Sequence, residues 1–247
     1  MEQHREAARQ RLIFALDVDN FDDAEKWVRQ LHRHVGVFKV GKQLFTRCGP
    51  EVVRMIRAEG GEVFLDLKYH DIPNTVAKAG LEACRLGVKI FNVHALGGRE
   101  MMETLVREVN QEFPVGSPER PLMLAVTILT SSTEQTLREV GIEHHVSEMV
   151  PRLASLANEA GLGGVVASPR EVRLIREACG EAFAIVTPGV RPASASLDDQ
   201  KRVMTPGEAI ATGADYLVIG RPISAADDPV AAADAILDEM AAAISER

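Results

Sequence analysis

The sequence has little of what would mark a secreted or disulfide-rich protein. Its 247 residues include only three cysteines, Cys48, Cys84 and Cys179, which are odd in number and far apart. This spacing argues against a disulfide framework and shows no metal-type pairing. We therefore expect reduced thiols in a cytoplasmic protein.

Long apolar runs and clusters of positive charge are also missing. No stretch approaches the roughly 18 apolar residues that a membrane-spanning helix needs. The N-terminal segment MEQHREAARQR is polar and lacks the apolar core of a signal peptide. The net charge is −8 at pH 7 without any lysine- or arginine-rich run. We therefore expect neither a nucleic acid nor a membrane as partner, while a single bound anion stays open.

Short apolar runs that alternate with amphipathic segments make up most of the chain. Hydrophobic residues account for 46% of the sequence, which allows a sizeable core. The runs predict strands and the segments between them predict helices. The expected strands cover residues 12–16, 35–40, 63–67, 88–93, 122–129, 164–167, 182–186 and 216–219. The expected helices cover residues 21–34, 43–58, 73–86, 99–112, 134–140, 146–160, 169–178 and the segment from Pro229 onward.

This alternation predicts an α/β fold with an all-parallel sheet, because parallel strands need helical crossovers. The strands are almost continuously apolar, as expected when both faces of a sheet are buried. We predict a (β/α)8 barrel of the TIM type, as a single domain over residues 1–247 with residues 1–10 as a polar N-terminal extension. A doubly wound open sheet is the alternative, but no Gly-x-Gly-x-x-Gly follows the first strand.

Charged residues gather at the end of the third expected strand, in the stretch EVFLDLKYHDIPNT over residues 62–75. The two-residue period of a strand puts Asp66 and Lys68 on one face, with Asp71 just beyond. Two carboxylates and an ammonium at the mouth of a core are costly unless they neutralise one another. The cluster is therefore either a structural ion pair or a catalytic group of charges.

The barrel prediction favours the catalytic interpretation. Barrel enzymes place their active sites at the carboxyl ends of the strands, where polar side chains converge. Polar side chains at or just past strand ends are Asp17, Lys39, Asp66, Lys68, Thr130 and Arg221.

Two loops in the last part of the chain predict an anion site. The segment TPGVRP over residues 187–192 follows the seventh strand, and GRP over residues 220–222 follows the eighth. Barrels often bind phosphate at these two loops through backbone amides. Glycine lets the backbone approach an anion, and arginine matches phosphate oxygens with a fork of donors. The long polar loop over residues 188–204 is expected to act as a lid.

Taken together, these residues resemble the bacterial type of the orotidine 5′-monophosphate decarboxylase family over nearly the whole chain. The resemblance lies in a D-x-K-x-x-D motif at Asp66, Lys68 and Asp71, and in FNVHALGG over residues 91–98. Further matches are Thr130, TPGVRP, Gln200 and Gly220-Arg221. The short motif alone is shared with phosphosugar decarboxylases and aldolases, whose metal-dependent members typically carry a glutamate where this chain has Lys39.

The resemblance implies removal of CO₂ from orotidine 5′-monophosphate to give uridine 5′-monophosphate (UMP), with no metal and no organic cofactor. It implies that Lys68 stabilises and then protonates the carbanion at ring carbon 6. Asp66 would lie beside the substrate carboxylate. Lys39 and Asp71 would complete an alternating row of charges.

The same resemblance implies a homodimer in which Asp71, Ile72 and Thr75 reach into the partner subunit's site. The other implied contacts are Asp17 and Lys39 to ribose hydroxyls, Thr130 to the pyrimidine, and Gln200, Gly220 and Arg221 to the phosphate, with Arg191 close by.

Two other functions stay open at this point. A metal-dependent keto-sugar-phosphate decarboxylase or aldolase on the same barrel would need a carboxylate in place of Lys39. A non-catalytic phosphate- or nucleotide-binding barrel would need the anion loops but not the charged cluster. The histidine pairs His32/His34 and His144/His145 are expected on the solvated surface.

Overall fold

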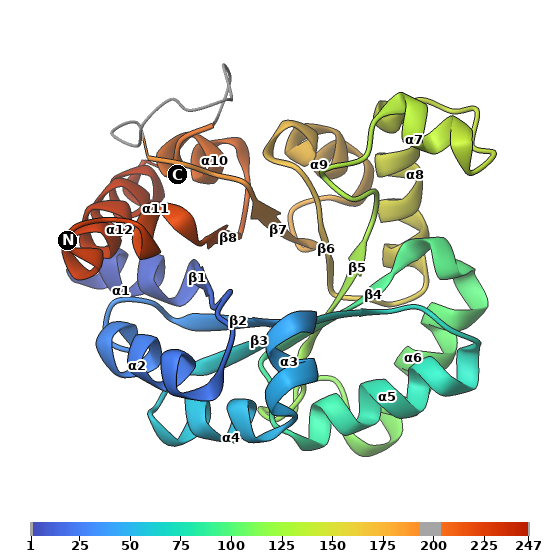
Figure 1. Ribbon diagram of the computed structural model, residues 1–247. Coiled ribbons are helices and arrows are strands. Elements are labelled where there is room, and N and C mark those ends of the chain that lie inside the picture. The colour runs from blue at the N-terminus through green and yellow to red at the C-terminus, as the bar shows by residue number, and fades with distance from the viewer. Residues whose placement is uncertain (1, 193–203, 247) are drawn as a thin grey trace. The chain divides into compact units, whose positions relative to one another are not determined.

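Parallel strands alternate with helices through the described part of the chain. The computed structural model describes residues 2–192 and 204–246 (Figure 1). The strands are β1 (Leu12–Ala15), β2 (Val37–Gly41), β3 (Glu62–Tyr69), β4 (Ile90–His94), β5 (Leu122–Val126), β6 (Gly164–Val166), β7 (Ala184–Pro188) and β8 (Tyr216–Ile219). They follow one another around a closed barrel in the order β1 to β8. This order confirms the predicted (β/α)8 fold.

Helices connect successive strands. They are α1 (Glu2–Arg11), α2 (Phe21–Leu31), α3 (Lys42–Cys48), α4 (Glu51–Ala58), α5 (Pro73–Arg85), α6 (Gly98–Glu112), α7 (Glu134–Glu139), α8 (Val146–Glu159), α9 (Val172–Cys179), α10 (Pro206–Thr212), α11 (Arg221–Ser224) and α12 (Pro229–Ser245). Two short 3-10 turns, η1 (Ala95–Gly97) and η2 (Pro169–Glu171), precede α6 and α9. None of the described helices is long and apolar enough to cross a membrane.

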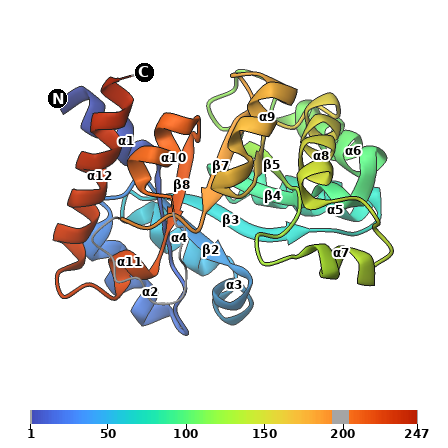
Figure 2. The same ribbon diagram turned by 90° about the horizontal axis from the view of Figure 1, so that it is seen from above.

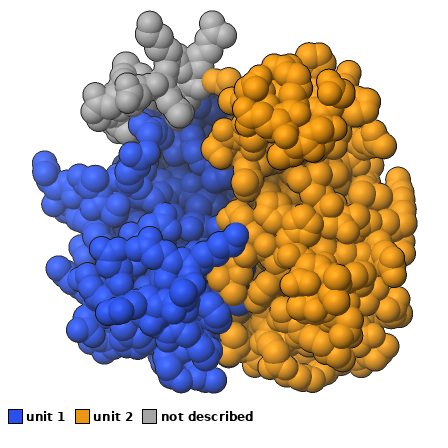
Figure 3. Space-filling model, turned by 45° about the vertical axis from the view of Figure 1, so that its right-hand side comes forward, with its two compact units in different colours: residues 1–66, 187–247 blue, residues 67–186 orange. Residues whose placement is uncertain are grey.

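The chain forms two compact units, residues 1–66 with 187–247, and residues 67–186 (Figure 3). In the first unit, β8, β1, β2 and β3 pair in parallel. Ile13 is in register with Val218 on one side and Val37 on the other, and Val40 is in register with Leu65. These side chains are buried in the core. The pairing fixes the carboxyl ends of β1, β2 and β3, which carry three of the expected site residues.

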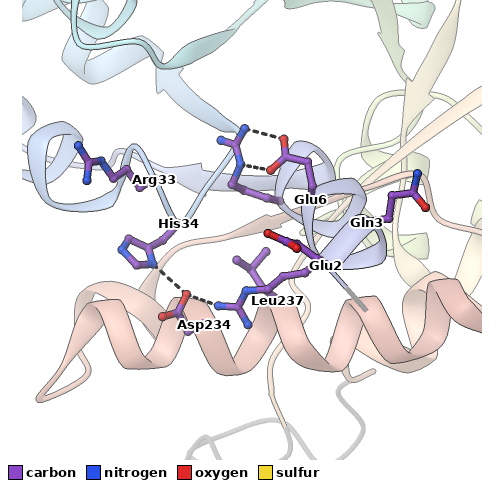
Figure 4. A pocket seen from close by; sticks show the side chains of 9 residues that line it. Glu2, Gln3, Glu6, Arg33, His34, Asp234 and Leu237 are labelled. Carbon is purple, nitrogen blue, oxygen red and sulfur yellow. Dashed lines mark hydrogen bonds and ion pairs between the residues drawn. The ribbon is translucent and has the colours of Figure 1, made fainter.

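Residues 1–10 were expected as a polar extension. Helix α1 (Glu2–Arg11) occupies most of this segment and packs along α12 (Figure 2). Arg5 donates to Asp234 at 2.6 Å, and Nδ1 of His34 lies 2.8 Å from the same carboxylate. These groups line a cavity of ≈930 Å³ beside α1 (Figure 4). Arg9 pairs with Glu6 in the same cavity. Because Arg5 and Arg9 each pair with a carboxylate that lines the cavity, we assign it a role in attaching α1.

In the second unit, β4, β5, β6 and β7 pair in parallel. Asn92 is in register with Leu124, and Ala125 with Val165. Helices α5 and α6 approach closely, because α5 has a buried glycine at position 80 where an added Cβ would overlap Leu105. This close packing covers β4, which carries a buried polar side chain considered below.

Besides α1, further helical segments differ from the prediction, among them α11, which was not expected. Residues 43–58 were expected as one helix but form α3 and α4, because Gly49 adopts a φ of +64° and Pro50 has no N–H to continue the ladder. Helix α10 was not expected. It is capped at its N-terminus by Thr205, which exchanges hydrogen bonds with Glu208. The expected strand 122–129 ends at residue 126.

Candidate active site

Lys39 on β2 lies between two carboxylates of the first unit. Its Nζ is 3.0 Å from Oδ1 of Asp17, which follows β1, and 3.8 Å from Oδ2 of Asp66 on β3. The side chains of Lys39 and Asp66 are 13% and 12% exposed, whereas that of Asp17 is 69% exposed. A half-buried pair of this kind is interdependent, because removing one partner leaves an uncompensated charge. Lys39 therefore fixes Asp66, while Asp17 stays open to a ligand.

Strand register supplies this geometry. Ala15 of β1 is paired with Lys39, and Gly41 of β2 is paired with Asp66. An added Cβ at Gly41 would lie 3.4 Å from Nζ of Lys39 and 3.8 Å from Oδ1 of Asp17. The glycine therefore leaves open space next to the ion pair.

Lys68, on the same strand β3 as Asp66, has a backbone conformation that is foreign to a strand. Its φ is 53°, and no other non-glycine residue in the described ranges has a positive φ. The left-handed conformation costs roughly 1–2 kcal/mol for a residue with a Cβ. The regular alternation used to place Lys68 from sequence therefore does not extend through this residue. Its backbone N–H instead donates to Oδ1 of Asn92 on β4 at 2.8 Å.

The turn after β3 presents three expected residues to solvent. Oδ1 of Asp71 accepts a hydrogen bond from the backbone N–H of Ile72 at 2.7 Å, and Pro73 then begins α5. Asp71, Ile72 and Thr75 are all exposed. The rings of His70 and His94 are tilted by 39° to each other, with centroids 5.5 Å apart. The turn is thus ordered locally while its charged and apolar side chains point away from the unit.

The expected phosphate residues of the first unit follow β7 and β8. At Gly220 an added Cβ would lie 3.1 Å from Cβ of Ala15, so the carboxyl end of β8 approaches β1 more closely than a larger residue would allow. Arg221 is exposed, and within residues 2–192 and 204–246 no hydrogen bond or ion pair occupies its guanidinium. The backbone N–H of Arg191 donates to the carbonyl of Met204 at 3.3 Å. Gln200 and most of the expected lid lie outside the described residues.

Two buried acids beside the site stay protonated. Burial raises the pKa of Tyr69 to about 12, with the charge of Cys84 as a smaller cause. Burial also raises the pKa of Cys84 to about 12. Neither group is therefore an ionised base or nucleophile near neutral pH.

The structure brings Asp17, Lys39 and Asp66 together in the first unit. Arg191, Gly220 and Arg221 belong to the same unit, whereas the second unit holds Lys68, Asp71, Ile72, Thr75 and Thr130. Thr130 is exposed in the turn after β5. Asp66 and Lys68 belong to different units, but both are on strand β3, where only one residue separates them.

Comparison with known proteins relates the chain to one family. The model of the "Orotidine 5'-phosphate decarboxylase / HUMPS family" matches residues 10–236. The chain belongs to this family. A relative from Syntrophotalea carbinolica named orotidine 5'-phosphate decarboxylase is 69% identical over 97% of this chain and 98% of its own. One of the same name from Geobacter sulfurreducens is 66% identical over 96% and 99%.

Solved structures agree with this relation. The crystal structure of orotidine 5'-phosphate decarboxylase from Lactobacillus acidophilus aligns with a TM-score of 0.82 at 39% identity, covering 93% of this chain and 98% of the other. The corresponding enzyme from Pyrococcus horikoshii aligns with a TM-score of 0.73 at 26% identity. The family relation therefore extends through the barrel.

Lys39, in the middle of β2, bears on the metal-dependent alternative considered from the sequence. That alternative needs a carboxylate where this chain has Lys39, whose ammonium occupies the space between Asp17 and Asp66. Among the described residues, no three side chains of histidine, cysteine, aspartate or glutamate form a group that could hold a metal ion.

Sequence reasoning missed Asn92. It lies inside the FNVHALGG segment, yet an asparagine in an otherwise apolar strand gives no sign of its partner. The available signal was its position in a run expected to be fully buried, where a polar side chain needs a hydrogen bond.

Proposed function

We propose that this chain decarboxylates orotidine 5′-monophosphate to UMP and CO₂, the last step of de novo pyrimidine biosynthesis, with Lys68 as proton donor. Family membership and relatives of 61–69% identity over nearly the full length support the reaction. At the level of the site, one observation carries the proposal: the half-buried Lys39 lies between Asp17 and Asp66. Asp66 is on β3, the strand that also carries Lys68.

The bond between ring carbon 6 and the carboxyl carbon breaks, CO₂ leaves, and the electron pair stays on carbon 6. This pair lies in the ring plane, where the π-system cannot absorb it. For such slow reactions an enzyme can have to lower the activation free energy by upward of ~20 kcal/mol. Preorganised charge is the available source of this stabilisation. The Lys68 ammonium then transfers a proton to carbon 6 and regains one from solvent.

Asp66 contributes through its fixed negative charge. The Lys39 ammonium lies 3.8 Å from it. By the family resemblance, Asp66 would lie beside the substrate carboxylate and repel it. The repulsion is relieved as neutral CO₂ departs, which favours the transition state over the bound substrate.

Substrate binding is assigned by the family resemblance. Asp17 and Lys39 would hold ribose hydroxyls, and Thr130 would contact the pyrimidine. Gly220, Arg221, Arg191 and Gln200 would hold the phosphate. The exposed carboxylate of Asp17 and the exposed guanidinium of Arg221 support these roles, because both are available to a ligand.

We further infer a cytoplasmic homodimer in which Asp71, with Ile72 and Thr75, completes the partner subunit's site. Large apolar side chains are exposed in the turns that follow β3, β4 and β5: Ile72 at 66%, Leu96 at 45% and Leu129 at 42%. Ile72 directly follows Asp71 in the chain, and so large an exposed apolar side chain supports a surface that a partner covers. The three free cysteines support a reducing compartment.

The test follows the ultraviolet absorbance of orotidine 5′-monophosphate during incubation with the purified protein, with and without exhaustive chelation. Turnover that chelation leaves unchanged is expected. Activity lost on chelation and restored by Mg²⁺ would instead support the metal-dependent alternative. Tight UMP binding without any turnover would support a nucleotide-binding barrel and contradict the proposal.

A further inference from the structure

Lys68 has a backbone conformation that its surroundings must enforce. Its φ of 53° is the one positive value among the non-glycine residues of the described chain. Steric overlap between Cβ and the backbone disfavours this region. Such conformations persist only where the surrounding structure over-determines them, and they concentrate at functional sites. The question is then which contact holds Lys68.

Asn92 makes that contact. Its Oδ1 accepts the backbone N–H of Lys68 at 2.8 Å. Asn92 is fully buried on β4 and is in register with Leu124 of β5, inside the paired part of the strand. A buried amide in an apolar strand is unfavourable unless it is hydrogen-bonded, and replacing it by an apolar residue would be the simpler way to build a core. The asparagine therefore contributes something that the core alone does not require.

We propose that Asn92 is a positioning residue, which holds the left-handed backbone of Lys68 and thereby directs the lysine amine toward the reacting carbon. The proposal rests on the proposed function, in which Lys68 protonates ring carbon 6. The φ angle of Lys68 sets the direction of its Cα–Cβ bond, so relaxation to an ordinary strand conformation would swing the whole side chain. Displacement of a catalytic group by about 1 Å can lower the rate roughly 100-fold.

The experiment compares three variants. Asn92→Leu keeps the size of the side chain but removes the acceptor, and Asn92→Asp keeps the acceptor. Val93→Ala, the buried neighbour on the same strand, is the matched control for general loss of packing in β4. For each variant, kcat, the Kd for UMP and the melting temperature are measured.

Asn92→Leu is expected to lower kcat roughly 10–100-fold with an unchanged Kd for UMP, because the groups that bind substrate lie elsewhere. Asn92→Asp should recover most of that loss. Val93→Ala should lower the melting temperature and leave kcat unchanged. Exchange of the carbon-6 hydrogen of UMP with deuterated solvent, which is the protonation step in reverse, should fall with kcat in Asn92→Leu.

Three results would overturn the inference. The first is a wild-type kcat in Asn92→Leu. The second is a loss of kcat in Val93→Ala as large as that in Asn92→Leu. The third is a kcat of Asn92→Asp that is no higher than that of Asn92→Leu. If Asn92→Leu does not fold, amide hydrogen exchange in the wild-type protein decides, because the Lys68 N–H should be protected and rapid exchange would contradict the contact. An inactive Lys68→Ala combined with a fully active Asn92→Leu removes only this inference, whereas an active Lys68→Ala removes the proposed function itself.

Discussion

Among single residues, Lys68 has the largest role in the proposed mechanism, in which its side chain supplies both the cation and the proton. Lys68→Ala should abolish turnover while the protein stays folded and binds UMP. Loss of a general acid typically costs ~10²–10⁴-fold, and loss of the cation should add to it. The matched control is Lys78→Ala, a lysine on α5 that lies 3.7 Å from Glu108 on the surface. Retention of more than a tenth of wild-type kcat would exclude Lys68 as the donor.

Arg221 tests the phosphate site separately from the chemistry. Arg221→Ala should weaken binding of UMP and leave binding of uridine nearly unchanged, because a charge-assisted fork forms only when phosphate is present. A hydrogen bond to a charged group contributes ~1.5–3 kcal/mol, which corresponds to roughly 10–100-fold in Kd. Calorimetric titration of both ligands measures the ratio, with Arg173→Ala on α9 as the control. Equal losses for UMP and uridine would mean that Arg221 acts only structurally.

Residue types at strand ends were readable from sequence, but their backbone geometry was not. Lys39 and Asp66 could be placed on neighbouring strands, and the ion pair between them agrees with that placement, although β2 and β3 continue past them to Gly41 and Tyr69. The positive φ of Lys68 could not be foreseen, because the two-residue period assumes regular strand angles throughout. Its partner Asn92 is 24 residues away in the chain, and only the folded barrel brings the two together.

At the scale of elements, apolar runs located every strand of the barrel because buried parallel strands are nearly continuous in hydrophobic residues. Helix boundaries were less readable. The break between α3 and α4 depends on the left-handed conformation of Gly49. Helix α10 is only seven residues long and contains Gly207, so its periodicity is weak, and its capping residues Thr205 and Glu208 were the better signal.

The packing of α5 on α6 gives an element-scale prediction. Gly80→Val should destabilise the fold by about 1–3 kcal/mol, because the added side chain meets Leu105 and Phe91. Denaturant unfolding measures the free energy of unfolding. Adding Leu105→Ala should return part of the loss by making room. If the double variant is less stable than expected from the sum of the two single changes, overpacking is not the cause.

Strand β3 also carries a prediction about alkaline stability. The pKa of Tyr69 is raised to about 12 in the folded chain from a reference value of 10.0. The unfolded state therefore loses its proton first, and stability present below pH 10 is lost as the pH rises toward 12. The contribution reaches ~2–3 kcal/mol at most. Tyr69→Phe should flatten this part of the curve of unfolding free energy against pH, and an unchanged slope would contradict the assignment.

At the scale of the whole molecule, the proposed shared site would make the activity depend on a second copy of the chain. Asp71 lies in an exposed turn at the carboxyl end of β3, with the exposed Ile72 beside it. If Asp71 acts only within its own chain, each polypeptide is catalytically complete, and dimers bring no new site. If Asp71 acts in the partner subunit, the sites exist only in the assembled dimer. The two models differ in how inactive chains complement one another.

Chains carrying Lys68→Ala and chains carrying Asp71→Asn should each be inactive as homodimers. After mixing and subunit exchange, one site of every heterodimer has lost both groups and the other site is intact. A two-fold interface requires this reciprocity, and random assortment of equal amounts restores about a quarter of wild-type sites. Activity is measured by orotidine 5′-monophosphate absorbance, and a pull-down through a tag on one chain shows that exchange occurred. Demonstrated exchange without recovered activity would mean that Asp71 serves its own chain, because each heterodimer would then contain two sites that each lack one essential group.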